Sequence, residues 1–228
     1  MCDQKVKNAI WVNSFDECSV RQFKIEFDEL NSSNIPMLPI IIDSFGGEVY
    51  SLLAMLDIIS TATKPVSTIA LGKAMSCGSL LLAYGTKGLR FAAPNSTIMV
   101  HDVASVSIGK IEELKADVSE GDRLNSRIYE ILDTQCGKNR GYFQKMISSK
   151  KHVNWYLDAK EALKHGIVDH VGVPAIDATF HMDIIEEFKN NPILLKPKSS
   201  TKKTTKKTTK KTTKKTTKKT TKKTTRKK

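Results

Sequence analysis

Ser76 is the first residue of this sequence whose setting suggests chemistry. It lies in Ala74-Met75-Ser76-Cys77-Gly78, after a strand-like segment and at the start of an apolar segment rich in small residues. A sharp strand-to-helix turn would present the Ser76 hydroxyl as a nucleophile, and the free N–H groups of the helix start would stabilise an oxyanion. A serine at this place is more commonly a helix N-cap, so Ser76 alone does not establish a site.

A glycine pair and a histidine are the partners that such a serine needs. Gly46 and Gly47 follow a buried strand, where bare backbone N–H groups could approach a substrate or simply form a tight turn. His101 directly follows the strand-like segment TIMV, and open α/β sheets build their sites at strand ends. A histidine there is also commonly a hydrogen-bonded core residue. Together the residues favour a site over three unrelated structural roles.

Strand-like and helix-like segments alternate along the chain and would position these residues. The apolar run Met37–Asp43 is typical of a buried strand, and apolar residues at three- and four-residue steps predict a long amphipathic helix over about 109–135. Strands are also expected at 66–71, 89–92, 97–100 and 168–171, helices at 49–59, 74–84, 140–149 and 158–165, and a terminal amphipathic turn at 180–188. Such alternation predicts an α/β fold with a mostly parallel sheet.

The charge of the chain is concentrated at its C-terminal end. The 228 residues carry a formal net charge of +13, but 17 Lys and Arg residues, and no Asp or Glu, lie between Lys196 and Lys228. The rest is mildly acidic, which argues against a nucleic-acid-binding domain. We predict a folded domain over 1–192 and a disordered Lys/Thr-rich repeat tail over 193–228. Such a tail is either a solvated segment only or a ligand for polyanions.

The composition excludes several classes of protein. With 39% apolar residues the chain can form a core, yet it has no apolar run of about eighteen residues that could span a membrane. The N-terminus lacks the features of a signal or transit peptide, so we expect a cytoplasmic protein without a membrane partner. The cysteines are too widely spaced to suggest disulfides or a zinc site, and we expect reduced thiols, no metal and no cofactor. They are Cys2, Cys18, Cys77 and Cys136.

The stretch from Ile40 to Gly172 resembles the ClpP family, the self-compartmentalising serine peptidases of the Clp system. The matching motifs are SFGG at 44–47, the ungapped block at 66–101 and the run AKEALKHGIVD at 159–169. The resemblance implies Ser76 as the nucleophile and His101 as its general base. It also implies an oxyanion hole formed by the backbone N–H groups of Gly47 and Cys77.

The resemblance further implies an architecture and partners. The fold would be ClpP/crotonase-like, with repeated β-β-α units, and the helix over about 109–135 would be a handle that interdigitates between two rings. We expect a homo-oligomer in the form of a double heptameric ring, which cleaves peptides or unfolded proteins in its chamber. A Clp ATPase is the expected unfoldase partner. The chain starts near the family's first core strand, so the segment that forms axial loops is expected to be absent, which leaves docking of the ATPase open.

The sequence departs from the family at the third triad position. Asn154 stands where the family has an aspartate, and an amide can hold the ring of His101 without the full charge stabilisation of an imidazolium. The same change in a trypsin-type triad lowers kcat about 10⁴-fold, so we expect reduced activity. Asp158 is the alternative acid, although an N-cap is its commoner role. Phe45 replaces a proline, and Asp102 adds a charge directly after His101.

Three other functions stay open. A catalytically weak or silent ring subunit with a scaffold role would account for Asn154 and Phe45. A phage- or virus-type variant that processes capsid scaffold is compatible with the unusual tail. A crotonase-type acyl-CoA enzyme would explain Gly47 but not the Ser76–His101 spacing. The thiol of Cys77 is expected to be buried and inert rather than reactive.

Overall fold

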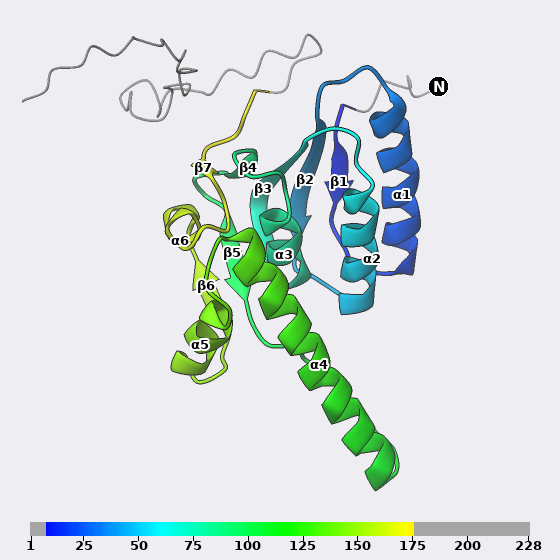
Figure 1. The fold of residues 1–228 in the computed structure, drawn as a ribbon, viewed down its shortest axis with the longest axis vertical. Coiled ribbons are helices and arrows are strands. Elements are labelled where there is room, and N and C mark those ends of the chain that lie inside the picture. The colour runs from blue at the N-terminus through cyan, green and yellow to red at the C-terminus, as the bar shows by residue number, and fades with distance from the viewer. Residues whose placement is uncertain (1–7, 176–228) are drawn as a thin grey trace, which may run out of the picture. The chain divides into compact units, whose positions relative to one another are not determined.

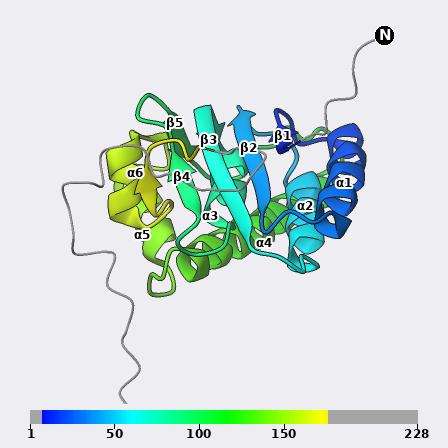
Figure 2. The ribbon, with the colours of Figure 1, turned by 90° about the horizontal axis from the view of Figure 1, so that it is seen from above.

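The structure, a computed structural model, describes residues 8–175. Its centre is a mostly parallel sheet, seen in Figures 1 and 2. The strands follow the order β1 (Ile10–Val12), β2 (Leu38–Ser44), β3 (Val66–Met75), β4 (Arg90–Ala92) and β7 (His170–Val171). In addition, β5 (Thr97–Val100) pairs in parallel with β3, and β6 (Trp155–Leu157) pairs antiparallel with β5. The predicted mostly parallel α/β fold is therefore confirmed.

Six helices accompany the sheet within residues 8–175. They are α1 (Glu17–Ser32), α2 (Val49–Ser60), α3 (Cys77–Ala83), α4 (Ile111–Gln135), α5 (Tyr142–Ser149) and α6 (Ala159–His165). Successive side chains of a strand point to opposite faces, and β2 is apolar on both. Ile40 and Ile42 join the main core with the helices, whereas Ile41 packs with Ile69 and Phe91 in a small cluster of its own. Burial of both faces explains why β2 is a continuous apolar run.

The length of β3 determines where the site lies. Its first half pairs with β4, and its last three residues, Lys73–Met75, pair with β5. Met75 is the register partner of Met99, so β3 and β5 end side by side. Because parallel strands carry their carboxyl ends at the same edge of the sheet, the residues that follow these two strands meet there.

The sequence prediction was wrong in detail at this point. The strand expected at 66–71 continues to Met75, and the helix expected at 74–84 begins only at Cys77. Pairing with β5 accounts for the difference, since it gives the backbone of Lys73–Met75 a sheet partner. The prediction also had no element before Met37, where β1 and α1 lie. The Asp16–Ser19 capping box and the buried spacing Phe23, Phe27, Leu30 were the signals for α1.

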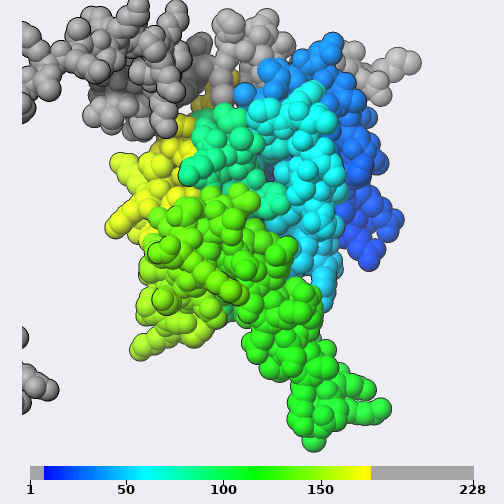
Figure 3. All heavy atoms as spheres, viewed as in Figure 1, coloured from blue at the N-terminus to red at the C-terminus, as the bar shows by residue number. Residues whose placement is uncertain are grey.

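The long amphipathic helix predicted over about 109–135 is present as α4. Its C-terminal half packs into the core through Ile128 and Leu132, whereas its N-terminal half projects beyond its neighbours, as Figures 1 and 3 show. Ile111 and Val118, on that half, are 71% and 66% exposed. No helix among residues 8–175 has the length and hydropathy needed to cross a membrane. The predicted turn at 180–188, the tail and the domain boundary near 192 lie outside the described residues.

Candidate active site

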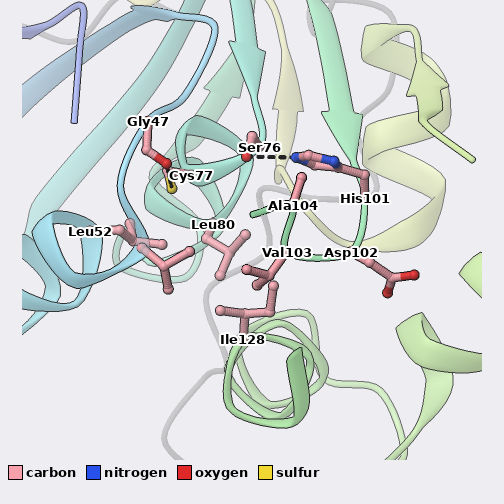
Figure 4. Close-up of a pocket in the computed structure, with 11 residues that line it drawn as sticks. Gly47, Leu52, Ser76, Cys77, Leu80, His101, Asp102, Val103, Ala104 and Ile128 are labelled. Atoms are coloured by element: carbon pink, nitrogen blue, oxygen red, sulfur yellow. Dashed lines mark hydrogen bonds between the residues drawn. The ribbon is translucent and has the colours of Figure 1, made fainter. Parts of the chain in front are cut away.

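Ser76 lies at the sharp turn between β3 and α3. Its backbone has φ +52° and ψ −121°, a conformation that side-chain-bearing residues rarely adopt. The residue occupies the N-cap position of α3, but its side chain makes no capping hydrogen bond. The Oγ atom instead lies 2.8 Å from Nε2 of His101 (Figure 4). The strained turn thus presents the hydroxyl to the imidazole and not to its own helix, which is the arrangement of a nucleophile elbow.

His101 follows β5 as Ser76 follows β3. The backbone N–H of Ser76 donates to the carbonyl of Met99 at 2.8 Å, which fixes the separation of the two chain segments. Burial lowers the pKa of the His101 imidazole, and the negative charge of Asp102 partly offsets that effect. A neutral imidazole at pH 7 can accept the proton of a serine hydroxyl, so the pair meets the geometric and protonation requirements of a general-base mechanism.

Gly46 lies directly against Ser76, and Gly47 lies against Phe15. A Cβ on Gly46 would come within 2.6 Å of the Ser76 Cβ, and one on Gly47 within 2.4 Å of the Phe15 carbonyl oxygen. Both residues also have positive φ, +107° and +154°. The Cys77 thiol donates to the Gly47 carbonyl at 3.2 Å and ties this loop to α3. A side chain at either position would force its neighbours to shift, and the absence of one lets the Gly46 backbone lie against the Ser76 side chain.

Replacement of Gly46 by alanine is expected to disrupt the site. The added methyl group would displace Ser76 or the loop that carries the Gly47 N–H, and loss of one such oxyanion donor typically costs about 10²–10³-fold in rate. We expect Gly46→Ala to slow covalent labelling of Ser76 by a fluorophosphonate by about 10²-fold or more. Gly121→Ala is the matched control, because no heavy atom lies within 4 Å of a Cβ at this position on α4. Equal labelling rates of the two variants would contradict the role of the glycine pair.

Cys77 is buried beside the serine, as expected. Burial raises the pKa of its thiol to about 11, so little thiolate exists at neutral pH. Cys18 and Cys136 are likewise free thiols. Among residues 8–175, no three His, Cys, Asp or Glu side chains gather in a way that could hold a metal ion.

The structure does not bring Asn154 to His101. The Asn154 amide is exposed and lies 3.4 Å from the hydroxyl of Tyr156. Asp158 accepts the N–H of Glu161 and caps α6 in a capping box, the structural role that competed with a catalytic one. Within the described part of the chain, Nδ1 of His101 has no hydrogen-bond partner. The structure thus brings the predicted Ser76 and His101 together beside Gly46, whereas the predicted third triad residue has no contact with the histidine here.

An apolar pocket of about 110 Å³ opens beside Ser76, as Figure 4 shows. Besides the site residues, its lining is mostly aliphatic and comes from α2, α3, α4 and the segment after β5: Val49, Leu52, Leu80, Val103 and Ile128. The sequence predicted these helical side chains only as core residues. Their periodicity marks the buried face of each helix, but not which buried residues border an opening.

Comparison with known proteins agrees with the geometry. The family model described as Clp protease matches residues 27–175 of this chain. The chain belongs to the Clp protease family. The resemblance to the ClpP family predicted from the sequence is confirmed.

Three curated relatives illustrate the similarity to other Clp proteases. An ATP-dependent Clp protease proteolytic subunit 1 from Rhodopirellula baltica is 33% identical over 136 residues, which are 59% of this chain and 58% of the relative. An ATP-dependent Clp protease proteolytic subunit from Deinococcus radiodurans is 36% identical over 126 residues, 55% of this chain and 60% of the relative. A proteolytic subunit 1 from Salinibacter ruber is 36% identical over 132 residues, 58% and 55%. The chain therefore matches less than two thirds of the length of these Clp protease subunits.

Proposed function

We propose that this chain is a serine endopeptidase of the Clp type, with Ser76 as nucleophile and His101 as general base. The observation that carries the proposal is the 2.8 Å contact between Ser76 Oγ and His101 Nε2, next to a glycine pair that no other residue type can replace. Neither N–H of the proposed oxyanion hole, at Gly47 and Cys77, donates a hydrogen bond shown within residues 8–175, so both are free for a substrate oxygen.

The reaction follows from these positions. The Ser76 hydroxyl attacks the carbonyl carbon of a peptide bond while its proton passes to Nε2 of His101. The carbonyl oxygen gains negative charge and accepts hydrogen bonds from Gly47 and Cys77. His101 then protonates the departing amine, the C–N bond breaks and an acyl-enzyme remains. Water, deprotonated by His101, hydrolyses the ester and restores Ser76.

The substrate proposed is an unfolded polypeptide bound as an added strand along Gly46–Gly47. The aliphatic pocket beside Ser76 favours an apolar residue before the cleaved bond, since burying such a side chain there removes it from water. The backbone N–H groups of Gly47 and Cys77 would then face the carbonyl oxygen of the reacting peptide bond, with His101 Nε2 as the acceptor of the Ser76 proton.

The proposed assembly is a ring-shaped homo-oligomer in which α4 is the handle. Val106 and Ile108, just before α4, are 93% and 97% exposed, and Ile111 and Val118 on α4 are also exposed. Exposed apolar side chains that gather in one patch mark interaction surfaces, and we propose that these four belong to such a patch. A closed chamber would restrict Ser76 to unfolded chains, with a Clp ATPase as unfoldase and the cytoplasm as the compartment. The basic tail over 193–228 is proposed to bind polyanions, a property that would weaken with salt.

Covalent labelling tests the proposed function. A fluorophosphonate reacts with serines that a neighbouring base activates, and mass spectrometry locates the adduct. We expect one adduct on the peptide that contains Ser76, and faster labelling as the pH rises through the lowered pKa of His101. An adduct elsewhere, or none on the full-length protein, would refute the proposal.

A catalytically weak ring subunit is the second candidate, favoured by the lack of a hydrogen-bond partner for His101 Nδ1 among residues 8–175. If assembly moves residue 154 next to the imidazole of His101, Asn154→Asp should raise the labelling rate by about 10-fold or more. The reason is that a carboxylate stabilises the imidazolium better than an amide does. Asn95→Asp, at an exposed position, is the matched charge control. An unchanged rate in Asn154→Asp, with the control also unchanged, would exclude an orienting role for position 154.

A further inference from the structure

Asp102 is the acidic residue nearest in sequence to the proposed base, and two donors hold its carboxylate. Oδ1 accepts the hydroxyl of Tyr129 at 2.5 Å, and Oδ2 lies 2.7 Å from Nδ1 of His152. Tyr129 comes from α4 and is buried, whereas His152 belongs to the turn after α5. In Figure 4 the carboxylate points away from the Ser76–His101 pair, so it makes no direct contact with the imidazole.

The turn that supplies His152 has an unusual backbone. Lys151 and His152 have φ values of +60° and +57°, in the left-handed region that side-chain-bearing residues seldom adopt. The N–H of His152 donates to the Ile147 carbonyl at 3.1 Å, and its ring reaches Asp102. Such a conformation persists where surrounding contacts fix it. The position of the Asp102 carboxylate is therefore defined from two separate elements.

The ionisable groups that face this carboxylate leave it as an acceptor. Burial and the Asp102 contact both raise the pKa of Tyr129, so its hydroxyl stays a neutral donor. Within residues 8–175, His152 is the other ionisable group that contacts the carboxylate. Asp102 in turn raises the pKa of His101 against the effect of burial. It is thus an anchored carboxylate one residue after a base whose Nδ1 has no hydrogen-bond partner within residues 8–175.

We propose that Asp102 is a positioning residue that stabilises the His101 imidazolium through space, in place of the aspartate that position 154 lacks. This inference rests on the proposed function, in which His101 must carry a positive charge after it deprotonates Ser76. Tyr129, which anchors the Asp102 carboxylate, lies on α4, so a shift of that helix would move the carboxylate relative to His101.

A titration of His101 tests the proposal without any catalytic readout. The full-length protein is labelled with ¹³C-histidine, and the His101 signal is assigned by its loss in His101→Gln. We expect Asp102→Asn to lower the pKa of His101 by about 0.5–1, the size expected for removal of a neighbouring unit charge. Asp102→Glu should restore the wild-type value. Asp57→Asn, an exposed acid on α2, should leave it unchanged.

The pH profile of fluorophosphonate labelling adds the functional readout. In Asp102→Asn the acidic limb should move to lower pH while the plateau rate falls about 3- to 10-fold, since the base is weaker and its cation less stabilised. If Asp102→Asn only disturbed the local structure, the plateau labelling rate would fall but the pH of the acidic limb would stay the same. An unchanged pKa of His101 in Asp102→Asn would overturn the proposal, whether or not Ser76 is labelled. Failure of the wild type to label Ser76, with the pKa shift present, would instead refute the peptidase function alone.

Discussion

Ser76→Ala is expected to lower kcat/KM for an unfolded peptide with an apolar residue before the cleaved bond by about 10⁴-fold or more. The hydroxyl that His101 contacts at 2.8 Å supplies the attacking oxygen, and alanine has none. Binding along Gly46–Gly47 and the oxyanion donors would remain, so KM should change far less than kcat. Steady-state cleavage of a fluorogenic peptide by the full-length protein measures both constants.

The matched control for this experiment is Ser148→Ala, at an exposed position on α5. It removes a hydroxyl with no described role and should retain wild-type kcat. Urea unfolding of both variants checks that the fold is intact. Residual activity in Ser76→Ala above about 1% of the wild type would show that another group is the nucleophile.

Asp169→Asn is expected to lower the free energy of unfolding by about 3–5 kcal/mol, because it leaves a buried guanidinium without its counter-charge. Asp169 accepts hydrogen bonds from Nε and Nη2 of Arg90 at 2.8 and 2.6 Å and from the N–H of Gly88 at 2.7 Å. The Arg90 side chain is only 2% exposed and also donates to the carbonyls of Ala83 and Gln135. This ion pair therefore links β4 to the ends of α3 and α4.

The same pair predicts an acid-sensitive contribution to stability. Burial by itself would raise the pKa of Asp169, but the hydrogen bonds and charge of Arg90 outweigh it and lower the pKa. A carboxyl with a depressed pKa stabilises the folded state above its unfolded pKa of about 3.9, and this contribution is lost as the pH falls through the folded-state value. The free energy of unfolding, measured with urea at pH 7 and below pH 4, should therefore decrease less on acidification for Asp169→Asn than for the wild type.

Glu17→Gln is the control for the ion pair, since the Glu17–Arg21 pair on α1 is 82% and 76% exposed. Such a surface pair contributes about 0–1 kcal/mol, so its loss should change the free energy of unfolding little. If Asp169→Asn were no more destabilising than Glu17→Gln, the buried pair would not be a determinant of stability.

Local patterns sufficed to predict the elements with strong periodicity. The apolar run of β2 and the three- and four-residue spacing of apolar residues in α4 each indicate a buried surface. The periodicity of apolar residues along a segment shows which of its faces is buried. The boundary between β3 and α3 was not predictable in this way. The segment Lys73–Met75 becomes strand because β5 pairs with it, and pairing depends on residues more than twenty positions away.

The candidate third triad residue illustrates the same limit. Alignment of the run that ends at Asp169 placed Asn154 beside His101, whereas its amide lies near Tyr156 in this structure. Loop conformation decides that outcome, and the left-handed turn at Lys151–His152 directs His152, not Asn154, toward the segment after β5. A spacing along the chain does not fix the direction of a side chain on an exposed loop.

The sequence by itself determined the chemical groups of the site: a serine at a helix start, a histidine at a strand end and two glycines where side chains cannot fit. These are properties of residue type and local conformation, so the sequence alone can predict them. Only the tertiary structure decided that Ser76 and His101 meet at 2.8 Å, that Asp102 is held by Tyr129 and His152, and that an apolar pocket opens beside them. Such distances arise from the register of β3 against β5 and the packing of α4, which no single segment encodes.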